Sequence, residues 1–233
     1  MLEWPLNQVK ATGFDRFAYA QKLNERVVGG GGKKGPFWGH PKNCSFVTKD
    51  RPEPFPFDSL RQTDTQTNGV QEVWKLCYAG SVGSQALLGI PRVADLRFNH
   101  FKDVSEVWPF ETGLGVGNKR VVFAEIWPGI VNGPVAQKQR QSGRVKDADQ
   151  VEAMVEWCIQ QDNLGKLAGW MTPKVKDLGK VIAEEGWILG AGESPESTDV
   201  ADLFAYAFAA ARKSGMSEDE IASLVEKLNG GGE

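Results

Sequence analysis

Residues 121–129, VVFAEIWPG, decide the fold class of this chain. Branched and aromatic apolar residues fill most of the run and Pro128 ends it, which is typical of a central strand buried on both faces of a sheet. Residues 105–111, SEVWPFE, predict a second strand that also stops at proline. Because helical patterns flank these strands, we expect an α/β fold.

Glu125 interrupts the apolar run of the first of these strands. A buried carboxylate must be paired, protonated or bound to a metal, because an isolated buried charge is very unfavourable. One interpretation is a salt bridge to a neighbouring Arg or Lys. The other is a functional site in which Glu111, at the end of the preceding strand, lies beside Glu125.

Asp147 is the candidate third carboxylate of such a site. Three converging carboxylates would suit Mg²⁺ or Mn²⁺ and metal-assisted phosphodiester cleavage, with Glu125 and Asp147 as the metal ligands. Asp147 is equally satisfied as a helix N-cap that forms a capping box with Gln150. Both interpretations of Asp147 stay open at this point.

Four segments have apolar residues at helical spacing or helix-terminal signals. The first ends at the glycine run 29–32, and the last is capped by Ser217 with Glu220 three residues on. A further short strand is predicted at 184–190, EEGWILG. The predicted helices span residues 14–28, 147–161, 199–213 and 218–228.

The stretch GSVGSQ at 80–85 is a glycine-rich turn that opens a short helix, which we expect to close at Gly89 and stop at Pro91. Exposed amides at a helix N-terminus favour an anion. The same glycines are equally suited to a tight turn or to close packing. The candidate anion-binding residues are Gly80, Ser81, Gly83, Ser84 and Lys75.

Residues 33–70 form a long segment rich in Pro, aromatic and polar residues, without helical or strand periodicity. A segment of this length is a functional loop, a lid or an insert. PFWG at 36–39, with Phe55 and Phe57, either packs on the domain or stacks on a base.

Charge is distributed unevenly, although the net charge is only −3. Residues 1–52 contain nine Lys or Arg and four acids, and residues 184–233 contain eleven acids and three bases. The basic part faces an anionic ligand or is solvated surface.

The chain lacks the signals of several protein classes. Three cysteines without a Cys-x-x-Cys pair argue against disulfides and zinc, and no apolar run approaches the roughly 18 residues of a membrane span. With only His40 and His100, no metalloprotease, Ser/His/Asp or Walker signature is present. We therefore expect a cytoplasmic protein without a membrane partner.

Several strings together resemble a known family, in order and in spacing. Over about residues 14–192, the chain resembles bacterial proteins labelled molybdopterin-guanine-dinucleotide or cobalamin biosynthesis related, which are similar to predicted nucleases of the ribonuclease H-like fold. The strings are PFWG (36–39), VWKLCYAGSVGSQALLGIP (73–91), VWPFET (107–112), VVFAEIWPGIV (121–131), KDADQV (146–151) and EEGWILG (184–190).

The resemblance implies a sheet whose strand ends carry acids for a divalent metal. Glu125 matches the acid of the family's A-E-[IV]-[YW]-P strand, and Asp147 matches the acid at the head of the following helix. The family's V-D-W-S and G-F-D-F-P strings, each with an expected metal-site aspartate, do not occur here. The resemblance thus implies a partial ribonuclease H-like domain over 1–192 that lacks its first strands, completed by a partner chain or a homodimer, and an acidic two-helix extension over 193–233.

Three functions remain as hypotheses. The first is a hydrolase of phosphodiesters or nucleotides that uses Mg²⁺ or Mn²⁺ and is incomplete alone, with nucleic acid or a nucleotide as its substrate. The second is a non-catalytic domain that binds a nucleotide or another anion, or that serves in assembly. The third, a cofactor-biosynthesis enzyme, has no supporting motif. Convergence of Glu111, Glu125 and Asp147 would indicate the hydrolase, and neutralisation of Glu125 by Arg or Lys would indicate the binding domain.

Overall fold

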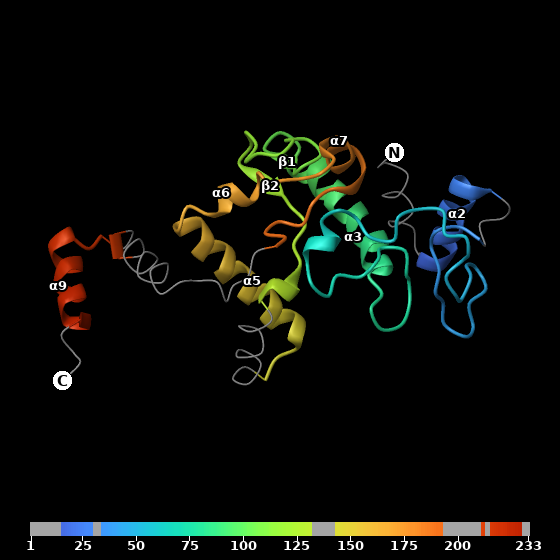
Figure 1. The fold of residues 1–233 in the computed structure, drawn as a ribbon, viewed down its shortest axis with the longest axis horizontal. Coiled ribbons are helices and arrows are strands. Elements are labelled where there is room, and N and C mark those ends of the chain that lie inside the picture. Colours follow the sequence, from blue (N-terminus) through green and yellow to red (C-terminus); the bar gives the residue numbers. More distant parts are fainter. Residues whose placement is uncertain (1–14, 30–33, 132–142, 193–210, 213–214, 230–233) are drawn as a thin grey trace. The chain divides into compact units, whose positions relative to one another are not determined.

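A computed structural model describes residues 15–29, 34–131, 143–192, 211–212 and 215–229 (Figure 1). The chain divides into two compact units. The first unit comprises residues 1–125 and 174–191, and the second comprises residues 126–173 and 192–233. None of the described helices is both long enough and apolar enough to cross a membrane.

The described residues combine helices with a two-stranded parallel sheet, which agrees with the predicted α/β class. Strand β1 (Ser105–Val107) pairs with β2 (Val121–Phe123), and Ser105 lies opposite Val121 (Figure 1). Both strands are much shorter than predicted. All three residues of β2 are only half-buried, so the prediction of a strand buried on both faces is wrong. The physical reason is that burial of both faces requires covering layers, which an apolar run does not itself supply.

Helix α2 (Arg16–Val28) confirms the first predicted helix. The Asp15 side chain accepts hydrogen bonds from the amides of Phe17 (2.8 Å) and Ala18 (3.3 Å), which satisfies two otherwise free donors of the first turn. The helix ends where Gly29 takes a positive φ of 69°.

The long segment after α2 contains no strand among its described residues and only one short helical turn, η2 (Asp64–Gln66). It is nevertheless held to the rest of the first unit. The amide side chain of the buried Asn24 donates to the Phe37 carbonyl and accepts from the Phe37 N–H, both at 2.9 Å. Gly35 is required here, because a Cβ atom at this position would clash with Asn24. The surrounding core consists of Phe17, Tyr19, Ala20, Val47, Leu76 and Leu87.

Helix α3 (Gly83–Asp95) continues into the single wide turn η3 (Leu96–His100). The prediction that Gly89 and Pro91 end this helix is wrong. Pro91 lies inside the helix and is fully buried, so packing compensates for the hydrogen bond that proline cannot donate.

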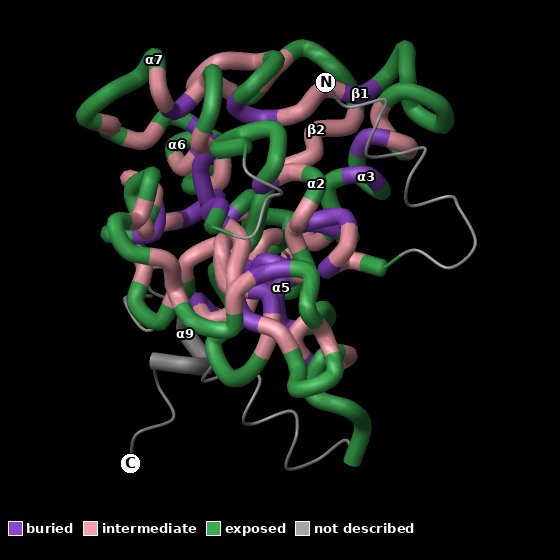
Figure 2. Tube along the Cα trace, turned by 90° about the vertical axis from the view of Figure 1, so that its right-hand side faces the viewer, coloured by how far each residue is buried: buried purple, intermediate pink, exposed green. Residues whose placement is uncertain are grey.

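The second unit contains η4 (Pro128–Val131), α5 (Lys146–Asn163) and α6 (Leu167–Trp170). Its core consists of Ile130, Val131, Ala153, Met154 and Trp157. Figure 2 shows buried segments of α5 in purple. Helix α5 confirms the predicted helix, but its N-cap is Val145 without a side-chain hydrogen bond, so the predicted Asp147–Gln150 capping box is wrong.

Residues 184–190 were predicted to form a strand, and this prediction is also wrong. Helix α7 (Leu178–Lys180) runs into the wide turn η5 (Val181–Glu185), and only Ile188 makes an isolated bridge, with Glu125. The apolar run 187–189 is too short to specify a strand when no neighbouring strand pairs along its length.

Helix α9 (Glu218–Asn229) confirms the last predicted helix and its cap. The Glu220 carboxylate accepts from the Ser217 N–H at 2.8 Å, and the Ser217 hydroxyl accepts from the Glu220 N–H at 3.3 Å. These two bonds form the predicted capping box. The predicted helix 199–213 lies largely outside the described residues.

Candidate functional site

Arg61 binds the side chain of Glu125, the carboxylate that interrupts the apolar run 121–129. Its Nη1 donates to Glu125 Oε2 at 2.6 Å, and its Nη2 donates to Glu125 Oε1 at 2.8 Å. The other side of the guanidinium donates to Asp64, from Nε at 3.1 Å and from Nη2 at 2.9 Å. We call Arg61, Asp64 and Glu125 the Arg61 cluster.

Local backbone geometry positions all three members of the Arg61 cluster. Asp64 begins η2 and also accepts from the Arg61 N–H at 2.9 Å, so the tight turn brings the acid back to its own arginine. Glu125 follows β2, and its carbonyl accepts from the Leu189 N–H at 2.9 Å. The cluster therefore joins the long segment to the end of the sheet.

Burial differs sharply within the Arg61 cluster. The Asp64 side chain is 4% exposed, whereas that of Glu125 is 46% exposed. Glu125 was predicted to be largely buried near other carboxylates, and the prediction of burial is wrong because β2 ends at Phe123. Burial alone would lower the pKa of Arg61, but the hydrogen bonds to Glu125 and Asp64 outweigh it and raise that pKa.

A second ion-pair group adjoins the Arg61 cluster in sequence. Lys180 Nζ lies 2.9 Å from Asp58 Oδ2 and 2.8 Å from Glu185 Oε1, and Glu185 Oε2 accepts from the Gln62 N–H at 3.0 Å. Burial would raise the pKa of Glu185, but the bond to Lys180, aided by Gln62, lowers it overall. These contacts neutralise another carboxylate and do not leave it free for a ligand.

Glu111, the second predicted catalytic residue, is bound by a different arginine. Arg97 donates to Glu111 from Nε at 2.7 Å and from Nη2 at 2.9 Å. The carboxylate also accepts from the Val107 N–H at 2.8 Å. The Arg97 hydrogen bond is the largest contribution to the lowered pKa of Glu111, despite partial burial. Glu111 and Glu125 thus occupy separate ion pairs.

Asp147, the third predicted residue, is exposed in the first turn of α5. The acid that α5 buries is Asp149, which accepts from Arg144 Nη2 at 2.9 Å. Sequence reasoning missed Asp149, although its four-residue spacing to the buried Ala153 and Trp157 places it on the core-facing stripe. Within the described ranges, no group of three His, Cys, Asp or Glu residues could hold a metal ion.

The amides of the predicted anion turn bind the chain itself. Ser81 N–H donates to the Tyr78 carbonyl at 3.1 Å, and Gly83 N–H donates to the Lys75 carbonyl at 3.0 Å. A Cβ atom at Gly83 would clash with the Val73 carbonyl. The geometry of Gly83 therefore favours the interpretation as close packing.

The side chains of this turn are also engaged. The Ser84 hydroxyl donates to the Leu76 carbonyl at 2.7 Å, and Lys75 Nζ donates to the Ala79 carbonyl at 2.7 Å. Gly80 has a φ of 72°, as a tight turn requires. The five predicted anion-binding residues are thus accounted for by local structure.

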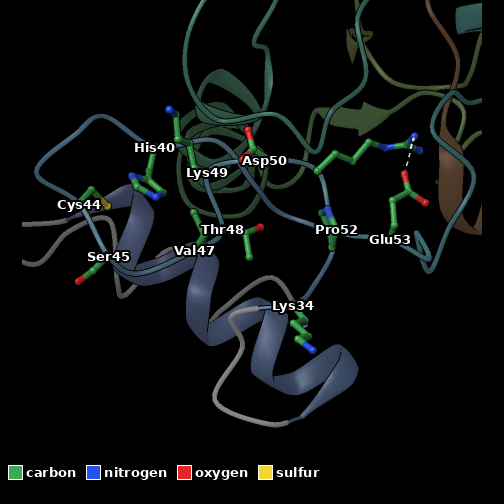
Figure 3. Close-up of a pocket in the computed structure, with 11 residues that line it drawn as sticks. Lys34, His40, Cys44, Ser45, Val47, Thr48, Lys49, Asp50, Pro52 and Glu53 are labelled. Carbon is green, nitrogen blue, oxygen red and sulfur yellow. Dashed lines mark ion pairs between the residues drawn. The ribbon is translucent and has the colours of Figure 1, made fainter.

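A cavity of about 640 Å³ lies elsewhere in the first unit, within the long segment (Figure 3). We call it the basic pocket. Figure 3 shows its lining along residues 40–53, with Lys34 contributed from the chain that follows α2. The lining residues are Lys34, His40, Cys44, Ser45, Val47, Thr48, Lys49, Asp50, Arg51, Pro52 and Glu53.

Two cations of the basic pocket have no acidic partner in the part of the chain that the structure describes. Neither Lys34 nor Lys49 forms an ion pair there, whereas Arg51 lies 3.7 Å from Glu53 and 3.8 Å from Glu72. The buried Thr48 hydroxyl oxygen also has no hydrogen-bond partner among these residues. The lining therefore carries two lysines that form no ion pair among the described residues, beside Asp50, which forms none there either.

Sequence reasoning associated the N-terminal part with an anionic ligand through its charge, but it did not identify this pocket. A pocket depends on which side chains the fold brings together, and residues 33–70 have no periodicity from which that could be derived. Comparison of the chain with protein-family models, with curated proteins and with solved structures finds no match.

Proposed function

We propose that this chain is a binding domain for a phosphate-bearing ligand of nucleotide type, held in the basic pocket. One observation carries the proposal. Glu125, the carboxylate expected to hold a metal, is ion-paired to Arg61, whereas Lys34 and Lys49 line a cavity and form no ion pair with any described residue.

The ion pairs argue against a hydrolase that works with the described residues alone. A divalent cation at Glu125 would have to displace a guanidinium that makes two short hydrogen bonds to it. Displacing Arg61 would also leave the buried Asp64 without its counter-ion. Both changes oppose metal binding at this position.

The size and charge of the basic pocket fit a small anionic ligand. Its volume lies within the range of about 300–1,000 Å³ that is typical of small-molecule sites. Lysine ammonium groups bind phosphate as point charges. Counting Lys34, Lys49 and Arg51 against Asp50 and Glu53, the lining carries a net charge of 3 − 2 = +1 with neutral histidine.

Isothermal titration of the full chain with adenosine diphosphate tests this proposal. We expect Lys34→Ala combined with Lys49→Ala to weaken binding about tenfold or more, because the lining loses two of its three positive charges. The matched control combines Lys174→Ala with Lys176→Ala, two exposed lysines of the same unit, and should leave affinity unchanged. Equal binding of adenosine without phosphate, or equal loss in both double variants, would contradict the proposal.

A metal-dependent hydrolase with a ribonuclease H-like fold is the second candidate. The observation that favours it is the convergence of the Asp64 and Glu125 carboxylates on one guanidinium, since both would face a metal if Arg61 moved aside. Parallel pairing of β1 and β2 is compatible with that fold. In this case Mg²⁺ or Mn²⁺ should support cleavage of nucleic acid or nucleotides, abolished by Glu125→Gln and retained by Glu111→Gln.

A further inference from the structure

The two edges of the small sheet differ in their hydrogen bonding. At β2, the Val121 N–H donates to the Val104 carbonyl at 3.0 Å, and the Phe123 carbonyl accepts from the Trp108 N–H at 2.9 Å. Val121 and Phe123 therefore face β1. Because main-chain groups alternate along a strand, those of Val122 and Ala124 face the opposite edge.

The outer edge of β2 is open in the part of the chain that the structure describes. No other described segment is hydrogen-bonded to the main chain of Val122 or Ala124 at this edge. Exposed N–H and C=O groups of an edge strand form a template for another strand. The edge is short, apolar and uninterrupted by proline.

Glu111 blocks the outer edge of β1 at Val107. The Val107 N–H donates to the Glu111 carboxylate at 2.8 Å, and the Glu111 N–H donates to the Val107 carbonyl at 2.8 Å. Both main-chain groups of Val107 are thus occupied by one residue. Strand pairing at this edge is therefore obstructed at Val107, whereas Val122 and Ala124 of β2 have no such obstruction among the described residues.

The two described strands form a smaller sheet than is normally stable on its own. Parallel strands normally lie in sheets that are covered on both faces, and sheets of two strands are marginally stable. All residues of β2 are half-buried. Additional strands at the β2 edge would complete both the hydrogen bonding and the burial.

We propose that two copies of this chain pair their β2 strands in antiparallel orientation, across a two-fold axis at Val122. The product is a continuous four-stranded sheet in the order β1–β2–β2–β1. An interface across a two-fold axis uses the same surface of both copies. Strand β2 must therefore be able to pair with a second β2 that runs in the opposite direction. Val122 meets this condition, because it would exchange both main-chain hydrogen bonds with the partner's Val122.

Charge complementarity supports a second copy as the occupant. The strand is preceded by Lys119 and Arg120 and followed by Glu125, so antiparallel pairing brings the cations of each copy toward the partner's Glu125. Among the described residues, Lys119 Nζ makes one hydrogen bond, to the Asp103 carbonyl at 3.1 Å, and its other N–H donors have no partner there. Glu125 is exposed enough to accept a further donor. A parallel pairing would instead place like charges together.

A cysteine cross-link tests the register of this dimer. Directly opposed residues of a hydrogen-bonded antiparallel pair have Cα atoms about 5.5 Å apart, within disulfide range. Val122→Cys should therefore form an interchain 122–122 disulfide on mild oxidation, identified by peptide mass spectrometry against the three native cysteines. Val116→Cys, an exposed position outside the sheet, is the control and should not cross-link to itself.

A charge reversal tests the interface in the absence of cross-linking. Light scattering and sedimentation should show a concentration-dependent dimer, and Lys119→Glu should weaken it about tenfold through repulsion of the partner's Glu125. Lys174→Glu, an exposed charge reversal in the same unit, should leave the dimer unchanged. A monomer at every concentration up to about 0.5 mM, or a dimer that forms no 122–122 disulfide and is insensitive to Lys119→Glu, would overturn the proposal.

Discussion

Arg61 and Arg97 each bind, through two hydrogen bonds, a glutamate that lies a few residues after a strand, yet their surroundings differ. Arg97 serves a single carboxylate, Glu111, whose side chain is 34% exposed. Arg61 serves Glu125, which is more exposed, and also Asp64, which is 4% exposed. The second pair is therefore part of a network that reaches the interior of the first unit.

The same Arg–Glu pair therefore has different energetic consequences, which depend on the other side chains that the arginine binds. Removing the arginine of a pair whose carboxylate is 34% exposed leaves a carboxylate that water can still solvate. Breaking a pair with a buried member leaves an uncompensated charge in a medium that solvates it poorly. The two arginines should therefore respond very differently to the same substitution.

The largest expected effect comes from replacing the arginines by methionine, which keeps the aliphatic stem. Arg61→Met should lower the free energy of unfolding by about 3–5 kcal/mol, because Asp64 loses its counter-ion. Arg97→Met should lower it by about 1 kcal/mol. Urea unfolding followed by circular dichroism measures both values, and equal losses in the two variants would refute the distinction.

The two acids of the Arg61 cluster should differ by a smaller amount. Asp64→Asn should lower the free energy of unfolding by about 2 kcal/mol, since a buried charge-assisted pair is weakened. Glu125→Gln should lower it by less than about 1 kcal/mol, because this carboxylate is exposed to solvent. The same urea experiment measures both variants, and a larger loss for Glu125→Gln would mean that exposure does not govern the cost.

The smallest expected effect is the pH dependence contributed by Glu111. Its pKa in the folded protein is lowered, so its stabilisation is fully present above its ordinary pKa of about 4.3 and is lost as pH falls through the lowered value. The Tm of the wild type should exceed that of Glu111→Gln by about 2 °C at pH 6, and the gap should shrink toward pH 3. A gap that widens on acidification would show the opposite sign of coupling.

The helices could be predicted from sequence to a large extent, because their signals are local. Gly29 ends α2 and the Ser217–Glu220 capping box begins α9, both as predicted, whereas the Asp15 cap of α2 was not among the predictions. Gly89 and Pro91 are also local signals, and they gave a wrong end for α3 because tertiary packing of Pro91 outweighed them. Local sequence signals therefore determine where a helix begins and ends, unless the burial of a residue outweighs them.

The strands could not be predicted to the same extent, because a strand is defined by its neighbours. The apolar run 121–129 predicted a long buried strand, and pairing with β1 extends only over Val121–Phe123. Beyond Phe123, the rest of this run makes a single described bridge, between Glu125 and Ile188. Nothing within the run itself determines where its partner strand stops.

The sequence indicated the candidate carboxylates of the site but not the arginines that bind them. The salt bridge of Glu125 to an arginine was one of the two predicted interpretations, whereas Glu111 was predicted to lie beside Glu125 and is bound by Arg97 instead. Arg61 lies 64 positions from Glu125, and Arg97 lies 14 positions from Glu111, so no helical or strand period connects either pair. Among charged residues that are so far apart in sequence, only the fold selects the partner.

The stacked indoles of the second unit have a spectroscopic consequence. The Trp157 and Trp170 rings lie 4.6 Å apart between centroids and are inclined by 19°, so their electronic transitions should couple. Coupled indoles give paired bands of opposite sign in circular dichroism, and these bands disappear once the rings separate. Since both rings belong to the second unit, the signal would report its melting independently of the first and show whether the two units unfold in one step.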